Sequence, residues 1–238
     1  MQIFIRPQAF EAISFDLDDN LYDNRPIIVA AEKALQQFLH QNYPKATAWQ
    51  FDDWRALKSH MLRQSPQLRH DTSKARLQML ELGLIELGYD RGAAQAGAKA
   101  GLAHFSLHRS NFKVSDEVLK LLAQLKQKYR LVGITNGNVD YQRIGLGDFL
   151  EFVLHPGLGY PQKPAADMFK VAANKLELPL NKILHVGDSA KSDVDGARAA
   201  GCQAAWLNPG FGVTQKSVAQ HQLPHIEISS ILQLKQLL

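Results

Sequence analysis

The stretch AISFDLDDNLYDN, residues 12–24, decides the fold of this chain of 238 residues. It begins with a short apolar run, Ile13–Phe15, of the kind that forms a buried strand. The run ends abruptly in three carboxylates, Asp16, Asp18 and Asp19. Carboxylates this close repel one another and are costly to bury at the end of a strand, so we expect a cation among them.

Apolar runs rich in β-branched residues recur along the chain, with helical patterns between them. After the first run, the strands are predicted at Leu131–Ile134, Ile183–Val186, Ala204–Leu207 and Ile226–Ile228, followed by a final helix. Apolar spacings of three and four residues predict helices around 118–125 and 168–176, and Gly201 marks the end of a helix that begins near Asp193. Strands that alternate with helices predict an α/β fold with a doubly wound parallel sheet.

One region breaks this alternation. Between about Pro26 and Arg109 only helical patterns occur, and they predict four helices, around residues 28–39, 51–62, 77–87 and 93–108. A helical domain is therefore inserted into an α/β domain just after its first strand. We expect the α/β domain to comprise residues 1–22 and 110–238, and the inserted domain to comprise residues 23–109.

The composition argues against several classes of protein. It is typical of a globular chain, with 45% hydrophobic and 21% charged residues, and no apolar run approaches the roughly 18 residues of a membrane helix. The N-terminus makes a poor signal peptide and the single cysteine fits a reducing compartment, so we expect a cytoplasmic protein. The net charge of +4 comes from scattered residues without a basic stripe, which argues against nucleic-acid binding. The oligomeric state is not readable from the sequence.

Polar residues follow three of the predicted strands. They are Asp16 and Asp18 after the first, Thr135 and Asn136 after the second, and Asp188 and then Asp193 after the third. Because ligands bind at the carboxyl ends of the strands in an open parallel sheet, we expect these residues to converge on one edge. Mg²⁺ prefers oxygen ligands of this kind, and the lack of a Cys/His cluster in the sequence argues against zinc.

Lys163 is the candidate that does not fit a pure metal site. It precedes Pro164, and the following stretch predicts a helix with this proline at its first position. A lysine beside a helix N-terminus creates a positive potential that suits a phosphate, although a solvated surface lysine is the commoner case. Carboxylates, Mg²⁺, the Thr135 hydroxyl and a lysine at one edge together describe a phosphoryl-transfer site.

Four ordered motifs carry a family resemblance. DLDDNLY (16–22), ITNG (134–137), QKP (162–164) and VGDSAKSD (186–193) resemble the motifs of haloacid-dehalogenase-superfamily phosphatases. Each motif alone is weak, but all four in this order are specific, and the helical insert is similar to the cap of the capped subgroup. The resemblance implies a Rossmann-like core with a helical-bundle cap, and a Mg²⁺-dependent phosphatase that acts on a small phosphate monoester.

The same resemblance implies a role for each motif residue. Asp16 would be the nucleophile that forms an aspartyl-phosphate, and Asp18 would protonate the leaving alkoxide and then activate water. Thr135 and the backbone N–H of Asn136 would bind a phosphoryl oxygen, and Lys163 would bridge Asp16 and the phosphate. The implied metal ligands are Asp16, Asp18 through its backbone carbonyl, Asp188 and, less directly, Asp193.

The substrate and two alternatives stay open. Strings such as LYDNRP (21–26) and ILHVGD (183–188) resemble a subgroup that acts on flavin mononucleotide (FMN) and on the ribitylamino-pyrimidine phosphate of riboflavin biosynthesis. One alternative is a haloacid dehalogenase, which shares the nucleophilic aspartate but needs no metal. The other is a non-catalytic, phosphate-sensing protein. Asn20 stands where the family usually has Thr or Val, which puts the rate in question.

Several nearby residues also have plain structural interpretations. Asp19 fits the start of a helix or the surface, and Asp193 could be the N-cap of the helix that follows it. His185 alternates within a strand, which predicts a core histidine. Tyr22 and Trp54 could stack on a flat substrate ring or simply pack.

Overall fold

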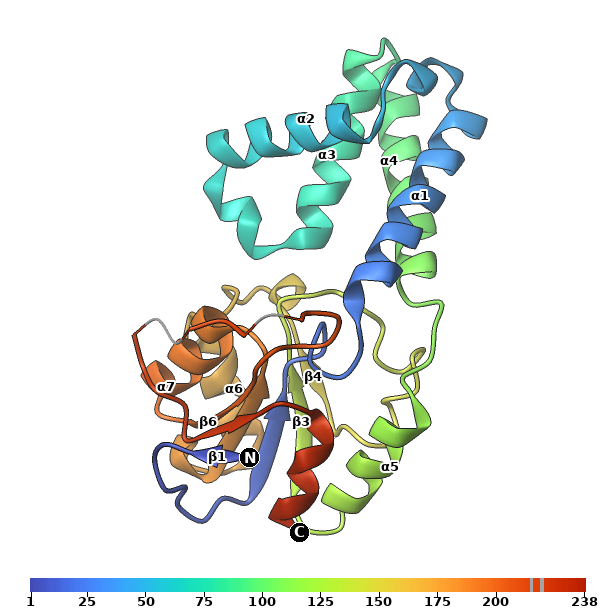
Figure 1. Ribbon diagram of the computed structural model, residues 1–238. Helices are drawn as coiled ribbons and strands as arrows, with labels where there is room; N and C mark the ends of the chain where they lie inside the picture. Colours follow the sequence, from blue (N-terminus) through green and yellow to red (C-terminus); the bar gives the residue numbers. More distant parts are fainter. Residues whose placement is uncertain (215, 219–220) are drawn as a thin grey trace. The chain divides into compact units, whose positions relative to one another are not determined.

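Strand β2 (Ala12–Phe15) lies inside a seven-stranded sheet of order β1-β7-β6-β5-β2-β3-β4 (Figure 1). It pairs in parallel with β3 (Arg130–Ile134) on one side and with β5 (Ile183–Gly187) on the other. All four residues of β2 are buried, which is why three of them are apolar, and the hydroxyl of the fourth, Ser14, lies 2.9 Å from His185 Nδ1. The other strands are β1 (Gln2–Ile3), β4 (Val153–Leu154), β6 (Gln203–Leu207) and β7 (Ile226–Ile228).

The structure, a computed structural model, describes residues 1–214, 216–218 and 221–238, which divide into two units. The core unit comprises Met1–Arg25, Phe112–Gly137 and Tyr141–Leu238, and the helical unit comprises Pro26–Asn111 and Asn138–Asp140. The short segment Asn138–Asp140 groups with the helical unit although it follows β3 in the sequence. Its contacts explain this, because Asn138 donates to the Ser73 hydroxyl and the Asp140 backbone N–H donates to the Ser110 hydroxyl, both at 3.0 Å.

Helices cover both faces of the sheet in the core unit. Helices α6 (Asp167–Leu176) and α7 (Gly196–Ala200) pack on one face, and α5 (Asp116–Leu125) lies with the 3₁₀ helix η6 (Ile231–Leu237) on the other (Figure 1). A π-helical turn, η5 (Ala190–Asp195), leads from β5 into α7, and the short 3₁₀ turns are η3 (Pro156–Leu158) and η4 (Leu180–Lys182). The predicted α/β fold with a doubly wound, mostly parallel sheet is confirmed.

The helical unit contains the four helices that the sequence predicts. They are α1 (Asn24–Asn42), α2 (Phe51–Gln64), α3 (Thr72–Glu86) and α4 (Arg91–Arg109), with 3₁₀ turns η1 (Pro44–Ala48) and η2 (Pro66–His70) between them. The apolar stripe of α1, with Ala31, Leu35 and Leu39, is buried in one cluster with Leu80 and Phe105. This unit therefore has a hydrophobic core of its own.

The sequence missed two strands of the core unit and misplaced the start of one helix. The two-residue strands β1 and β4 are too short to leave a pattern in the sequence, and the predicted final helix is present as the 3₁₀ helix η6. The helix expected at Pro164 begins only at Asp167. The reason is that the Asn136 side chain bonds both the N–H and the C=O of Lys163, at 2.8 and 3.0 Å, which holds that segment in a turn.

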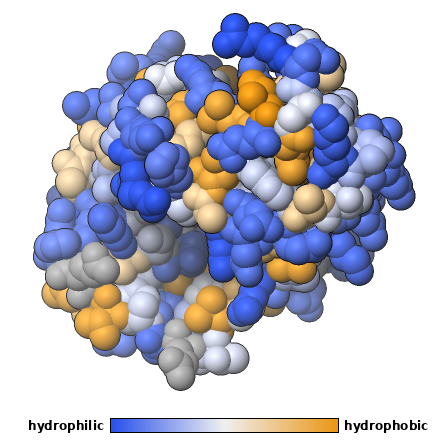
Figure 2. All heavy atoms as spheres, turned by 90° about the horizontal axis from the view of Figure 1, so that it is seen from above, coloured by the Kyte–Doolittle hydropathy of each residue, from blue (hydrophilic) through white to orange (hydrophobic). Residues whose placement is uncertain are grey.

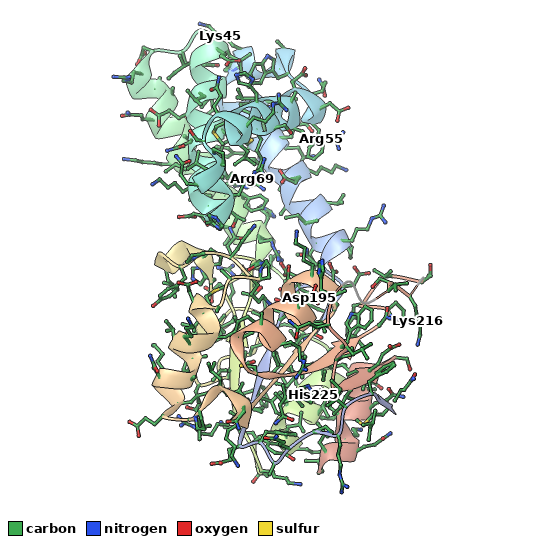
Figure 3. The ribbon with its side chains drawn as sticks, turned by 90° about the vertical axis from the view of Figure 1, so that its left-hand side faces the viewer. Lys45, Arg55, Arg69, Asp195, Lys216 and His225 are labelled. Carbon is green, nitrogen blue, oxygen red and sulfur yellow. The ribbon has the colours of Figure 1, made fainter. Side chains whose placement is uncertain are left out.

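The charged surface matches the scattered basic residues of the sequence. Lys45, Arg55 and Arg69 lie on three different helices of the helical unit, and Lys216 lies on the core unit (Figure 3). The face drawn in Figure 2 is mostly hydrophilic, with groups of hydrophobic residues between the hydrophilic ones. Among the residues that the structure describes, no helix is both long and apolar enough to span a bilayer.

Candidate active site

Three adjacent parallel strands end in the polar residues singled out from the sequence. Asp16 follows β2, Thr135 follows β3 and Asp188 follows β5, so the sheet order β5-β2-β3 places Asp16 between the other two. The backbone N–H of Asp16 continues the ladder by donating to the Val186 carbonyl at 2.8 Å. Carboxylate oxygens of Asp16, Asp188 and Asp193 lie within 4.8 Å of one another.

Lys163 is the buried cation of this cluster. Its side chain is fully buried, and its Nζ lies 3.2 Å from Asp16 Oδ1 and 2.7 Å from Asp193 Oδ1. Nζ also donates to the Ile134 carbonyl at 2.6 Å. Although burial alone lowers the pKa of a lysine, Asp16 and Asp193 outweigh it and raise the pKa of Lys163, so the ammonium stays charged. It is a buried part of the site and not a solvated surface lysine.

Within the described part of the chain, the contacts of the Asp16 carboxylate are at one oxygen. Its Oδ1 accepts from the Leu17 backbone N–H at 2.8 Å and faces Lys163, whereas Oδ2 takes part in neither contact. Burial raises the pKa of Asp16 to about 7. The Lys163 ammonium acts to lower this pKa, whereas the carboxylates of Asp193 and Asp18 raise it further. A carboxylate fixed at one oxygen in this way presents the other for attack on an electrophile.

Asp18 and Thr135 lie beside the nucleophile candidate. The Tyr22 hydroxyl donates to Asp18 Oδ1 at 2.6 Å, and the Tyr22 ring packs edge-on against Phe112. Thr135 is buried, and its hydroxyl accepts from the Gly137 backbone N–H at 3.0 Å. A Cβ on Gly137 would lie 2.5 Å from Asp18 Oδ2, so the Asp18 side chain lies directly against this glycine.

Asp193 is fully engaged by the protein. Its Oδ1 accepts from Lys163 at 2.7 Å and contacts His185 Nε2 at 3.2 Å, and its Oδ2 accepts from the Ser189 backbone N–H at 2.9 Å. Burial alone would raise the pKa of Asp193, but Lys163 and His185 outweigh it and hold that pKa well below its usual range. Ser189, not Asp193, is the N-cap of the turn that follows, because its side chain accepts from the Ser192 backbone N–H.

His185 is the core histidine that the strand pattern predicts, and it also contacts the site. Nδ1 lies 2.9 Å from the Ser14 hydroxyl and Nε2 lies 3.2 Å from Asp193. Burial and the nearby Lys163 lower the pKa of His185, so the ring is neutral. With Nε2–H donating to Asp193, Nδ1 accepts from the hydroxyl of Ser14. The sequence showed the burial of this histidine but not its contact with Asp193.

Asp188 occupies the edge of the cluster. The Trp206 indole N–H donates to its backbone carbonyl at 2.8 Å, and a Cβ on Gly210 would lie 2.7 Å from the Cβ of Asp188. Burial, with Asp193 and Asp16 nearby, raises the pKa of Asp188 to about 8. Trp206 and Gly210 were not found from the sequence, since neither belongs to a motif that carries charge.

Asn20, the departure from the family pattern, has a defined position. Its side chain is fully buried, and its amide N–H₂ donates to the carbonyls of Asp16 at 2.9 Å and Val186 at 3.2 Å. It therefore ties the ends of β2 and β5 together directly behind the carboxylate of Asp16.

Asp19 accepts from the N–H of Asn24, the first residue of α1, which supports its interpretation as a helix-start residue.

The donor set fits a hard divalent cation. Within the described part of the site, three carboxylates converge around one ammonium group, that of Lys163, which leaves an excess of negative charge. The raised pKa values of Asp16 and Asp188 have burial as their largest cause, and repulsion by Asp193 is the next contribution that raises each of them. Because Asp193 already uses both of its oxygens, Asp16 and Asp188 are the carboxylates best placed to hold an ion.

Gly187→Ala is expected to lower activity strongly. A Cβ at Gly187 would lie 2.2 Å from the Cγ of Asp193, so the carboxylate that holds Lys163 has to move. We expect kcat to fall by about 100-fold or more, because a displacement near 1 Å at a site costs about that much. Steady-state kinetics compares the kcat of this variant with that of Gly147→Ala, the control, where the added Cβ would lie 3.4 Å from its nearest neighbouring atom. Equal kcat values in the two variants would contradict this account.

Without a metal ion, stability is expected to fall as the pH rises. The pKa values of Asp16 and Asp188, about 7 and about 8, exceed the ordinary 3.8, so the folded chain holds protons that the unfolded chain releases. From about pH 6.5 to about pH 8, the free energy of unfolding therefore falls. Below this range the lowered pKa values of His185, His104 and His225 act in the opposite direction, and the shifts of Asp193 and Lys163 also lie outside it. Thermal unfolding in EDTA and in Mg²⁺ measures the effect.

The expected result is a Tm that falls with pH in EDTA and a stabilisation by Mg²⁺ that grows with pH. Asp16→Asn removes one of the two groups and should flatten the EDTA series. A Tm in EDTA that stays level or rises over the same range would show that these carboxylates ionise normally without metal.

Comparison with known proteins links the chain to a hydrolase family. Residues 10–201 match the haloacid dehalogenase-like hydrolases. Over 236 residues the chain is 38% identical to the 5-amino-6-(5-phospho-D-ribitylamino)uracil phosphatase YigB of Escherichia coli (strain K12), with 99% of each protein covered. It is also 29% identical over 139 residues to the N-acylneuraminate-9-phosphatase of Homo sapiens, which covers 56% of this chain and 55% of that enzyme.

Solved structures share the fold. The 2-haloacid dehalogenase from Pseudomonas syringae pv. Tomato DC3000 superposes with a TM-score of 0.88 at 32% identity, covering 95% of this chain and 97% of that one. The HAD-hydrolase YfnB from Bacillus subtilis, solved with bound magnesium, gives a TM-score of 0.66 at 21% identity, covering 97% and 99%. Both likenesses extend over nearly the whole chain.

Proposed function

The chain belongs to the haloacid dehalogenase-like hydrolase family, and from this we propose that it is a Mg²⁺-dependent phosphatase of small phosphate monoesters. The observation that carries the proposal is the carboxylate of Asp16, fixed at Oδ1 by Leu17 and Lys163 with Oδ2 in neither contact. The full-length similarity to a curated phosphatase supports the choice of reaction within the family.

The reaction is proposed to proceed in two displacements at phosphorus. Asp16 Oδ2 attacks the phosphorus of the ester, the bond to the ester oxygen breaks, and Asp18 gives its proton to the departing alkoxide. Asp18, now a carboxylate, takes a proton from a water molecule that attacks the aspartyl-phosphate. Inorganic phosphate leaves, and both aspartates return to their starting states. The Tyr22 hydroxyl, 2.6 Å from Asp18 Oδ1, orients that side chain in both steps.

The other residues hold the phosphoryl group and balance its charge. Lys163 offsets the repulsion between Asp16 and the phosphate, and Asp193 and Asn136 keep Lys163 in place. Thr135 is proposed to donate its hydroxyl proton to a phosphoryl oxygen, with the Asn136 backbone N–H beside it. Mg²⁺, held by Asp16, Asp188 and the carbonyl of Asp18 with Asp193 behind them, would supply a positive charge that stabilises the phosphoryl oxygens.

The proposed substrate is a ribityl phosphate attached to a flat heterocycle. The relative from Escherichia coli is named for the phosphate of such a compound, a ribitylamino-uracil, and it aligns with 99% of this chain. FMN carries the same ribityl phosphate on a larger ring. We therefore propose the riboflavin precursor or FMN as the substrate.

A haloacid dehalogenase is the second candidate, because the solved structure with a TM-score of 0.88 is a 2-haloacid dehalogenase. That reaction displaces a halide from carbon with a nucleophilic aspartate and needs no metal. A reaction without a metal would leave the acidic cluster of Asp16, Asp188 and Asp193 without a chemical role beyond the nucleophile. The phosphatase is therefore the better supported of the two.

Phosphate release from a panel of esters separates these functions. The panel contains the ribitylamino-uracil phosphate, FMN, sugar phosphates and nucleotides, each assayed with Mg²⁺ and then with EDTA, and chloride release from 2-chloropropionate is followed in parallel. We expect Mg²⁺-dependent phosphate release that favours the two ribityl phosphates. Equal release from all esters would discard the substrate proposal, and chloride release without phosphate release would replace the phosphatase by the dehalogenase. No release of either would favour a non-catalytic phosphate sensor.

A further inference from the structure

Ser14 is the one polar residue of the buried strand β2, and its partner is a histidine of the neighbouring strand. In the parallel pairing of β2 with β5, Ser14 lies opposite His185. The Ser14 hydroxyl is 2.9 Å from His185 Nδ1, and both side chains are fully buried. Polar groups inside an apolar sheet are costly unless their hydrogen bonds are complete, so the other ring nitrogen needs a partner as well.

The second ring nitrogen of His185 contacts the active site. Nε2 lies 3.2 Å from Asp193 Oδ1, the oxygen that also accepts from Lys163 at 2.7 Å. The Phe169 ring packs perpendicular to the imidazole, with the ring centroids 5.0 Å apart. The imidazole is therefore held at both nitrogens and packed against a third side chain, which fixes its orientation.

The charges of the site set the direction of each hydrogen bond in this row. Although burial alone would raise the pKa of Asp193, Lys163 and His185 hold that pKa well below its usual range, so the carboxylate is ionised and only accepts. Nε2 of the neutral imidazole therefore carries the proton and donates to Asp193. Nδ1 has no proton and accepts from the Ser14 hydroxyl. The opposite tautomer would turn the lone pair of Nε2 toward the carboxylate, which repels it.

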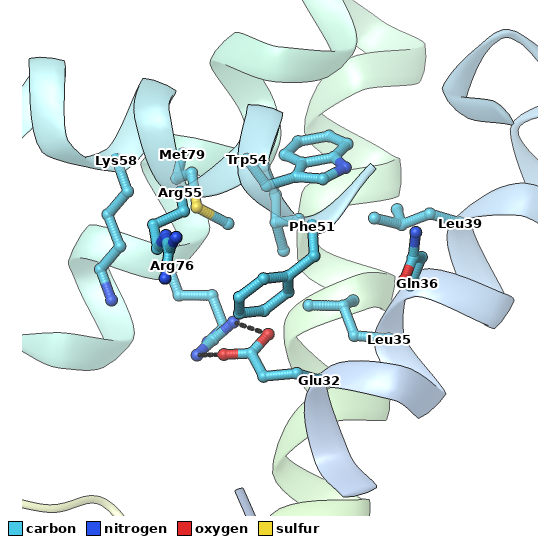
Figure 4. Close-up of a pocket in the computed structure, with 11 residues that line it drawn as sticks. Glu32, Leu35, Gln36, Leu39, Phe51, Trp54, Arg55, Lys58, Arg76 and Met79 are labelled. Carbon is cyan, nitrogen blue, oxygen red and sulfur yellow. Dashed lines mark hydrogen bonds and ion pairs between the residues drawn. The ribbon is translucent and has the colours of Figure 1, made fainter. Parts of the chain in front are cut away.

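A buried polar contact in the helical unit makes a useful contrast. There Arg76 donates to both oxygens of Glu32, at 3.0 and 2.6 Å, beside a pocket between α1, α2 and α3 (Figure 4). Because Glu32 belongs to α1 and Arg76 to α3, this ion pair joins two helices. The contact of His185 differs in kind, because the atom that it reaches is the oxygen that holds Lys163.

Asp193 passes this contact on to Lys163. Its Oδ2 accepts from the Ser189 backbone N–H at 2.9 Å, and its Oδ1 accepts from His185 and from Lys163. Donors of the protein therefore fix both oxygens of the carboxylate, and the carboxylate in turn fixes the ammonium. Without the donor at His185 Nε2, the carboxylate is free to turn about its contact with Ser189, and the ammonium that it holds moves with it.

We propose that His185 is a positioning residue of the active site, which holds Asp193 and through it places Lys163 beside Asp16. Lys163 Nζ lies 2.7 Å from Asp193 Oδ1 and 3.2 Å from Asp16 Oδ1, so a displacement of Asp193 alters the charge that faces the nucleophile candidate. Ser14 anchors the ring from the neighbouring strand. The assignment rests on the proposed phosphatase function, because it concerns the same site.

Three substitutions of His185 separate its hydrogen-bond donor from its volume. The carboxamide of His185→Gln reaches the place of Nε2 and keeps a donor for Asp193, whereas that of His185→Asn reaches only the place of Nδ1 beside Ser14. His185→Leu keeps neither. We expect His185→Asn and His185→Leu to lower kcat about 10- to 100-fold, the usual cost of removing a residue that orients a ligating side chain. The kcat of His185→Gln should stay close to that of the unchanged protein. Steady-state phosphate release with Mg²⁺ measures it.

His225→Leu is the matched control, because His225 is a buried histidine of the same unit. Its Nδ1 accepts from the Ala204 backbone N–H at 3.1 Å, and its Nε2 lies 3.2 Å from Arg198 Nη1. This variant should unfold more easily and keep its kcat. If His185→Gln and His185→Asn lowered kcat equally, or if His185→Leu kept the full kcat, the imidazole would only fill the core and the proposal would be wrong.

The ¹H–¹⁵N NMR signal of the Lys163 ammonium tests the same contact in EDTA and without turnover. Lys163→Met identifies the signal, because the signal disappears in that variant. We expect it to move in His185→Leu and His185→Asn and to stay in place in His185→Gln. A signal that stays in place in all three variants, or moves equally in all three, would overturn the proposal. Because this measurement needs no substrate, it decides the role of His185 even when no ester is hydrolysed and the phosphatase function fails.

Discussion

Asp16→Asn is expected to lower phosphate release by about four orders of magnitude or more without unfolding the protein. The amide cannot attack phosphorus, and Asp193, the other carboxylate beside Lys163, already has both of its oxygens engaged by the protein. The fold should tolerate the change, because burial already raises the pKa of Asp16 to about 7 and a neutral side chain there relieves repulsion. Steady-state phosphate release and thermal unfolding at about pH 8 measure the two effects.

Asp148→Asn is the matched control, because Asp148 is an exposed aspartate of the same unit. It should leave both rate and Tm unchanged. If Asp16→Asn kept a tenth of the activity, the carboxylate would be a ligand or a turn residue and not the nucleophile.

Lys163→Met is expected to abolish activity and to lower stability by about 3–5 kcal/mol, the cost of removing one partner from a buried ion pair. The ammonium is fully buried between Asp16 and Asp193, at 3.2 and 2.7 Å. Without it, both carboxylates stay buried close together with no cation of the chain between them. Chemical denaturation in EDTA measures the free energy of unfolding, and phosphate release measures the activity.

A control variant and a double variant show whether the stability loss of Lys163→Met comes from the lost charge or from the changed packing. Lys170→Met removes an exposed lysine of α6 and should change little. Adding Asp193→Asn to Lys163→Met should restore part of the stability, because it removes one of the two orphaned charges, while activity stays absent. A double variant less stable than Lys163→Met alone would mean that the pair is held by packing and not by charge.

The sequence predicted most of the fold because the buried strands leave continuous apolar runs and the helical insert leaves clear stripes. Residues 12–15, 130–134 and 183–187 form the strands that carry the motifs. The elements it missed, β1 and β4, are two residues long and are defined by their neighbours in the sheet. The start of α6 was placed too early because the hydrogen bonds from Asn136 to Lys163 come from a segment 27 residues away.

The charged residues of the site could be predicted from the sequence, whereas most of the residues that hold them in position could not. Carboxylates at strand ends stand out in the sequence, because a carboxylate is costly to bury unless a cation or a hydrogen-bond donor lies beside it. The supporting groups are ordinary residues in the sequence, such as Gly187 against Asp193 and Trp206 on the Asp188 carbonyl. Asn20 looked like a weakness of the motif, yet its amide joins the ends of two strands. Such roles depend on contacts between distant segments, which spacing along the chain does not encode.

Trapping the acyl phosphate on Asp16 tests the central claim most directly. Borohydride added during turnover of FMN or the ribitylamino-uracil phosphate reduces an aspartyl-phosphate to homoserine, and mass spectrometry of the peptide that carries residue 16 locates it. We predict homoserine at position 16, dependent on substrate and Mg²⁺ and absent when Asp16 is replaced by Asn. Phosphate release at full rate with no reduced residue, or with reduction at Asp188 instead, would contradict the account.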